Sequence, residues 1–251
     1  MSPDSSRREL LRNSIALGVA GLGVAGAMTL PLLGQPAAQE AKEEKKGGDK
    51  EPEVTATEDL MREHGVIRRA LLVYYEVIPK LRQNPGSVDA AALRQTAQLF
   101  RTFGEDYHER MLEEQHIFPL IRKQGAELTR YADILTAQHQ RGREVTDYVL
   151  AVTNGGKISS AHAEPLAKVF ETFVLMYQNH AAREDTIVFP AWKKNFTDKQ
   201  LDEVGDQFED IEHKMFGKDG FEDAEKKISD IEGRLGFADL ARFTPPAPPK
   251  P

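Results

Sequence analysis

The chain of 251 residues contains no cysteine. This absence excludes disulfide bonds, thiolate metal ligands, iron–sulfur clusters and cysteine nucleophiles, and it also excludes the acylated cysteine that anchors a lipoprotein. Strand-like alternation of apolar and polar residues is missing as well, which argues against a β-sheet.

The sequence also lacks a strong excess of one charge. Its formal net charge is −7, and acidic and basic residues are mixed along the chain. Without a basic patch, nothing supports binding to nucleic acid. Apolar residues make up 40% of the chain, which is enough for one hydrophobic core.

Residues 1–38 are predicted to be an export signal. A basic region is followed by an uncharged stretch of 19 residues from Ile15 to Leu33 that is rich in glycine and alanine. The order Ser6-Arg7-Arg8-x-Leu10-Leu11 resembles the twin-arginine signal. We therefore expect the twin-arginine export machinery as a partner and a periplasmic or exported protein. If the segment stayed uncleaved, it would anchor the protein, since 19 residues can just span a bilayer.

The remaining chain divides by composition. Residues 39–56 are charged and poor in apolar side chains, which predicts a disordered linker. Residues 244–251, TPPAPPKP, are typical of an extended proline-rich tail. Between them we expect a helical bundle over residues 57–195 and a C-terminal helical extension over residues 196–243.

The predicted fold class is all-α, an up-down-up-down four-helix bundle with a C-terminal helical extension. Four segments carry apolar residues at helical spacing, the first beginning at a Thr57 cap. The short connections at Asn84-Pro85-Gly86, Gly125 and Asn154-Gly155-Gly156 favour antiparallel neighbours. The predicted buried positions are Leu60, His64, Ile67, Leu71, Tyr75 and Ile78 in the first helix, Leu128, Tyr131, Leu135, His139, Gly142 and Thr146 in the third, and Leu166, Phe170, Phe173, Tyr177, His180, Glu184 and Ile187 in the fourth.

The extension is predicted to contain two helices. Residues 197–216 form an amphipathic pattern opened by the capping box Thr197-x-x-Gln200, with Leu201 and Phe208 on its apolar side. A shorter helix is expected from about Phe221 to Leu235. Both are expected to cover the outside of the bundle.

The two halves of the bundle repeat one another. His64 and His139 are 75 positions apart, while Glu113-x5-Pro119 and Glu184-x5-Pro190 are 71 apart. The first and third helices each carry a histidine on the buried stripe, and the second and fourth each carry a histidine, a glutamate and Phe-Pro. Such a repeat predicts pseudo-twofold symmetry, which would bring four histidines toward one level of the bundle.

Four buried imidazoles in one small core need many partners. A single buried histidine is usually a core residue with one hydrogen bond, but a metal would satisfy all four together. Imidazole and carboxylate ligands without sulfur suit iron or manganese, and zinc less well. His180 and Glu184 lie one helical turn apart and can reach one centre. A dinuclear site is therefore favoured over a metal-free bundle.

These motifs resemble the hemerythrin-like (HHE cation-binding) domains, over residues 57 to 192. The resemblance implies a four-helix bundle with two non-haem iron ions bridged by two carboxylates. By this likeness the ligands are His64, His108, His139 and His180, with Glu113 and Glu184 bridging. The residues that carry the resemblance are Glu63-His64, Tyr107-His108-Glu109, Glu113-Glu114, Ile117-Phe118-Pro119, Gln138-His139, His180-x-x-x-Glu184-Asp185 and Val188-Phe189-Pro190.

One departure from the family pattern lies in the second helix, where His108 and Glu113 are five residues apart instead of four. In a regular α-helix this spacing turns the pair about 140° apart, against about 40° for four residues. A π-bulge would absorb the extra residue. We predict such a widening, with an i→i+5 hydrogen bond and both side chains facing the core. The alternative is a regular helix in which Glu109 replaces His108 as a ligand.

A second departure concerns the fifth histidine of the oxygen-carrying hemerythrins. The position four residues after His139 holds Arg143, which cannot bind a metal. Glu109, His116, His213 or water could fill the gap. His116 gives the spacing of ferritin-like carboxylate sites, but its equivalent in the repeat is Ile187, which disfavours a ferritin-like centre.

The favoured function is binding of O₂ or NO by an exported di-iron protein, for sensing, storage or detoxification. The alternatives are a di-iron oxidoreductase or peroxidase-like enzyme, and an iron-handling protein of the cell envelope. The sequence offers no general acid beyond the predicted ligands, so binding is favoured over turnover and no catalytic residue is assigned.

Overall fold

The computed structural model describes residues 54–250, and every regular element in that range is helical. The predicted export signal and most of the predicted linker lie outside the described residues. Within residues 54–250, no helix combines the length and the apolar character that crossing a membrane requires.

Four long helical segments form the body of the protein. Two of them are unbroken runs in which a π-helical stretch joins two α-helices. The segments are α2 (Ala56–Gln83); α3 (Ala90–Leu99), η2 (Phe100–Ile117) and α4 (Phe118–Ile121); α5 (Ala126–Thr153); and α6 (Ser160–Arg183), η4 (Glu184–Val188) and α7 (Phe189–Lys193).

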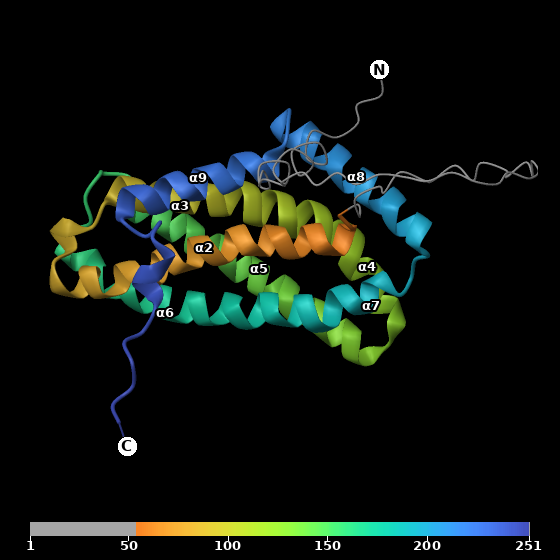
Figure 1. The fold of residues 1–251 in the computed structure, drawn as a ribbon, viewed down its shortest axis with the longest axis horizontal. Coiled ribbons are helices and arrows are strands. Elements are labelled where there is room, and N and C mark those ends of the chain that lie inside the picture. Colours follow the sequence, from red (N-terminus) through yellow and green to blue (C-terminus); the bar gives the residue numbers. More distant parts are fainter. Residues whose placement is uncertain (1–53, 251) are drawn as a thin grey trace, which may run out of the picture. The chain divides into compact units, whose positions relative to one another are not determined.

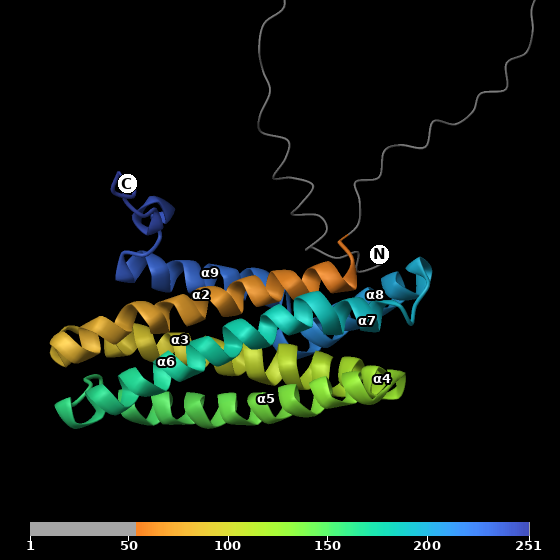
Figure 2. The ribbon, with the colours of Figure 1, turned by 90° about the horizontal axis from the view of Figure 1, so that it is seen from below.

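The four segments lie side by side along the long axis, and their colours show the chain reversing direction from each to the next (Figures 1 and 2). Helix α2 packs mainly against α6, and α3 packs against α5. The reversals use short turns: η1 (Pro85–Ser87) after α2, and η3 (Arg122–Gln124) followed by Gly125 before α5. Gly125 has a φ of 131°, a conformation that favours glycine.

Two predictions for α2 are wrong. Thr55, not Thr57, caps the helix, because the Thr55 side chain accepts a hydrogen bond from the Glu58 amide. Tyr75 is 58% exposed, and Tyr74 takes the core position at 1% exposure. Either tyrosine fits a helical period, but the Tyr74 ring stacks on Phe170 at 4.5 Å between centroids.

The predicted widening of the second segment is confirmed, with both His108 and Glu113 buried, and it is longer than one bulge. The π-helix η2 has 18 residues, and the Phe118 amide donates to the Glu113 carbonyl. Buried Gly104, His108, Glu113 and Ile117 follow one another at steps of four, five and four residues. This wider spacing keeps all four on one face, which a regular α-helix would not do.

A second π-helical turn, η4, was not predicted. Here the Phe189 amide donates to the Glu184 carbonyl, as Phe118 does to Glu113. The turn moves the buried position from Ile187, which is only partly buried, to Val188. In both halves of the repeat, therefore, the backbone carbonyl of a site glutamate accepts an i→i+5 hydrogen bond from the phenylalanine amide of the Phe-Pro motif.

The C-terminal extension forms α8 (Asp198–Phe216), α9 (Gly220–Leu235) and the short η5 (Leu240–Phe243). The predicted capping box at Thr197 and Gln200 is confirmed. Helix α8 packs on α2 and η2, and α9 lies along α2 and α3 on the outside of the bundle (Figure 2). The extension therefore covers the first half of the bundle, away from α5.

Candidate metal centre

Six of the seven predicted site residues meet in the bundle core. Each is no more than 3% exposed, and they come from all four long segments. They are His64 of α2, His108 and Glu113 of η2, His139 of α5, His180 of α6 and Glu184 of η4.

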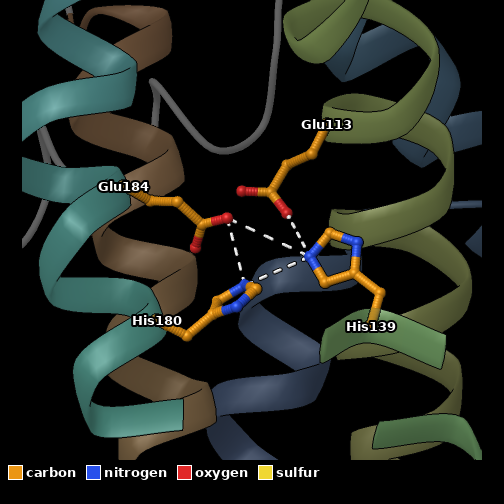
Figure 3. A group of neighbouring side chains, drawn as sticks. All are labelled: Glu113, His139, His180 and Glu184. Carbon is orange, nitrogen blue, oxygen red and sulfur yellow. Dashed lines mark hydrogen bonds and ion pairs between the residues drawn. The ribbon is translucent and has the colours of Figure 1, made fainter. Parts of the chain in front are cut away.

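The two glutamates each turn one oxygen toward each pair of histidines. Glu113 Oε2 lies 3.2 Å from His139 Nε2, and its Oε1 lies 3.4 Å from His108 Nε2. Glu184 Oε1 lies 3.0 Å from His180 Nε2, and Glu184 Oε2 lies 3.4 Å from His64 Nε2. Figure 3 shows how Glu113 and Glu184 converge on His139 and His180. The two carboxylates thus lie between the pair His64 and His108 and the pair His139 and His180.

Most of these converging atoms lie close together without a hydrogen-bond partner in the described part of the chain. Both carboxylate oxygens of Glu113 and of Glu184, and Nε2 of His108, have no hydrogen-bond partner among the residues that the structure describes. The Nε2 atoms of His139 and His180 face each other at 3.1 Å. A buried polar atom without a partner costs roughly 1–3 kcal/mol. A cation would satisfy these atoms together, so the donor set fits a pair of metal ions.

The electrostatics of the core favour positive charge. Burial alone would lower the pKa of His108, but the charge of Glu113 and a hydrogen bond to Glu63 outweigh it and raise that pKa well above its usual value. Burial would likewise raise the pKa of Glu184, but His180 and His64 hold it well below its usual range. The pKa of Glu113 is also lowered, by His108 and His139, so both carboxylates favour the charged form that a cation would need.

A second layer of polar groups fixes the four imidazoles. Each Nδ1 atom contacts one side-chain oxygen, which leaves each Nε2 facing the centre. The contacts are His64–Asp185 at 2.7 Å, His108–Glu63 at 2.7 Å, His139–Glu114 at 2.9 Å and His180–Gln138 at 2.9 Å.

These four outer residues were not predicted from the sequence to be part of the site. Each is adjacent in the chain to a predicted ligand, but it contacts a histidine from a different helix, because neighbours on a helix point about 100° apart. A signal was present in the repeat. Glu63 and Gln138 are 75 positions apart, and Glu114 and Asp185 are 71 apart, the same offsets as the predicted ligands.

The Phe-Pro motifs also belong to the site. The Phe118 ring stacks on His139 at 5.5 Å between centroids, and the Phe189 ring stacks on His64 at 5.3 Å. Each phenylalanine therefore supports a histidine from another helix, which orients the imidazole and excludes water from one face.

Arg143 occupies the position where oxygen-carrying hemerythrins have a fifth histidine. Its guanidinium pairs with Glu114 at 2.6 Å. Arg68, 75 positions earlier, pairs in the same way with Asp185. Arg143 is therefore the repeat partner of Arg68, and both hold an outer carboxylate in place.

The three candidates for a fifth ligand lie in different surroundings. Glu109 is 1% exposed beside His139, and burial raises its pKa to about 7. His116 faces the Phe208 ring at 5.7 Å, and His213 is paired with Asp219 at 3.3 Å. Among the described residues, neither histidine belongs to a group that could hold a metal ion. Glu109 alone of the three lies next to the centre.

Comparisons with known proteins agree with this geometry. The hemerythrin HHE cation binding domain matches residues 55–218. The uncharacterized protein Rv1995 of Mycobacterium tuberculosis (strain ATCC 25618 / H37Rv) and the uncharacterized protein Mb2018 of Mycobacterium bovis are each 44% identical to this chain over 198 residues, which cover 78% of the chain and 76% of each relative. No solved structure gave a significant match. The chain belongs to the family of hemerythrin HHE cation-binding domains.

Proposed function

We propose that this metal-binding protein holds two iron ions in its bundle core. His64 and His108 bind one ion, His139 and His180 bind the other, and Glu113 and Glu184 bridge the two. The observation that carries this proposal is that each of the two glutamates presents one oxygen to each pair of histidines at 3.0–3.4 Å. We infer an up-down-up-down bundle, which would bring one ligand-bearing stretch of each long segment to the same level.

The choice of iron follows from the ligand chemistry. Imidazole and carboxylate without sulfur suit iron and manganese, while zinc prefers four ligands in a closed tetrahedral site. Two carboxylates shared between two centres provide more donors than one tetrahedral ion needs. Iron can also change its oxidation state, which zinc cannot.

We propose that the iron pair binds O₂ or NO, for sensing, storage or detoxification. A hollow of about 170 Å³ on the surface between α5 and α6 is lined in part by Leu135, Gln138 and His180. It reaches a site histidine from outside and is small enough to favour a small ligand. The chain's own part is to bury the centre, to orient four imidazoles and to restrict access.

Spectroscopy of the reduced protein tests gas binding. Anaerobically reduced, iron-loaded protein should develop a new charge-transfer absorption band on exposure to O₂ or NO. Iron that is bound without a spectral response to either gas would favour an iron-handling protein instead. Consumption of peroxide or O₂ over many turnovers would favour the enzymatic alternative.

We also propose export through the twin-arginine machinery to the periplasm. The support is the Ser6-Arg7-Arg8-x-Leu10-Leu11 motif before the uncharged stretch. Export after folding would let iron be inserted inside the cell, away from copper and zinc, which bind such ligands more tightly. Replacement of both Arg7 and Arg8 by lysine should abolish export of the full chain, and unchanged export would contradict this route.

A further inference from the structure

The symmetry of the metal centre is broken at Gly142 of α5. Its repeat partner, 75 positions earlier, is Ile67 of α2. A Cβ atom at Gly142 would lie 2.1 Å from the Tyr177 hydroxyl, so no other residue fits there without displacing the phenol. Glycine is unfavourable inside a helix. Its presence leaves room for the Tyr177 hydroxyl beside the centre.

The Tyr177 hydroxyl holds a further buried carboxylate, that of Glu109. It donates to Glu109 Oε1 at 2.6 Å, and Arg143 lies 3.4 Å from the other oxygen. An oxygen of Glu109 lies within 4.8 Å of a ring nitrogen of His139. Glu109 thus lies next to the centre, but its hydrogen bonds go to Tyr177 and Arg143.

The spacing along the chain shows why Glu109 is there. Glu109 precedes Glu113 by four residues, as His180 precedes Glu184. In a regular helix Glu109 would take the ligand position, but the widened η2 gives that position to His108. In the other half of the bundle Ile67 lies near Gly104, and the buried glutamate there, Glu63, accepts from Tyr107 and contacts His108 Nδ1. Glu109 instead contacts Tyr177 and Arg143, which makes the His139 side different from the His64 side.

We propose that Glu109 is an exchangeable third carboxylate ligand of the metal ion on the His139 side. The Tyr177 hydroxyl holds it off that ion and thereby keeps a coordination position open to a small external anion or gas. Tyr177 is a positioning residue, and Glu109 is the group that it positions. This inference rests on the proposed function, because it requires a metal ion between His139 and His180.

Azide, a small anion that binds open iron positions, is the probe for this proposal. Its affinity is measured by optical titration of the iron-loaded full chain. In Tyr177→Phe, Glu109 is released to occupy the open position, so azide affinity should fall about tenfold or more, the effect expected when a hydrogen bond to a charged group is lost. Glu109→Gln should bind azide at least as tightly as the wild type. The double variant should match Glu109→Gln, because without the carboxylate the tyrosine has nothing to hold.

Two matched variants separate this effect from the loss of a buried polar group. Tyr74→Phe removes a buried tyrosine hydroxyl that has no hydrogen-bond partner among the described residues. Glu105→Gln alters a buried carboxylate bonded to Thr146, at 2.5 Å, one turn away. Both should keep the wild-type azide affinity.

The outcomes that overturn the proposal are distinct from failure of the proposed function. Unchanged azide affinity in an iron-loaded Tyr177→Phe variant would overturn the proposal. A double variant whose azide affinity is as low as that of Tyr177→Phe would also overturn it. If Tyr177→Phe does not fold, the Glu109→Gln variant decides: azide binding weaker than in the wild type would overturn this proposal and leave the proposed function untouched. A wild-type protein that holds no iron pair would instead refute the proposed function.

Discussion

One of the four site histidines, His180, has a different kind of partner at its Nδ1 atom. Three of them contact a carboxylate through Nδ1, whereas His180 contacts the amide oxygen of Gln138. A carboxylate makes an imidazole a stronger donor than a neutral amide does. His180, which also borders the surface hollow, is therefore expected to be the weakest donor of the four to a metal.

Replacement of Gln138 by alanine should weaken metal binding about 10–100-fold, because outer partners orient the ligands they contact. The measurement is a competition titration with a chelator. Gln140→Ala is the matched control, since Gln140 lies on the same helix with an exposed side chain. Equal affinities for the two variants would show that the Gln138 contact does not support the site.

Loss of a predicted ligand should have a larger effect. In His180→Ala or Glu184→Ala, other buried polar groups lose their shared partner, at a cost of about 1–3 kcal/mol each. Both metal content and melting temperature should fall, as measured by metal analysis and thermal unfolding. The controls are His162→Ala and His213→Ala, which should change neither quantity. Equal loss in the His213 variant would mean that the extension contributes to the centre.

At the scale of the helix, the sequence predicted the widening of η2 because Phe-Pro fixes the register after Glu113. It did not predict its full length, since the spacing of Gly104 and His108 also fits a regular helix. It did not predict η4 either, because His180 and Glu184 are spaced as an α-helix requires. Only the shared pattern of a glutamate five residues before phenylalanine marks both π turns.

Deletion of Met111 tests the widening directly. It restores the four-residue spacing between His108 and Glu113, so the variant should still bind iron. Met111 is preferred to Leu112, which is fully buried and fills the core. As a control, deletion of the exposed Thr172 in the regular helix α6 should abolish metal binding, because His180 and Glu184 would both rotate by about 100°. Loss of iron in the Met111 deletion alone would contradict this account.

At the scale of the whole molecule, the order of the helices and the four histidine positions could be predicted from the sequence, because helical periodicity and an internal repeat both mark them. The outer carboxylates, Tyr177 and Gly142 could not be assigned roles in the same way. Their roles depend on contacts between helices. The periodicity of one helix predicts which of its residues face the core, but not which residue of another helix each of them contacts.

The extension should stabilise the bundle without taking part in the centre. Ile228 of α9 is fully buried, and its replacement by alanine should lower stability by about 2–5 kcal/mol. Urea unfolding measures this loss, while metal content should stay at the wild-type value. A variant that keeps its stability but loses metal would mean that α9 supports the centre and not the packing of the bundle.

Metal analysis of the purified full chain tests the central claim most directly. Glu113 and Glu184 each present one oxygen to each pair of histidines, so the di-iron proposal predicts about two iron atoms per chain. A single zinc ion per chain, or no tightly bound metal, would contradict the di-iron account.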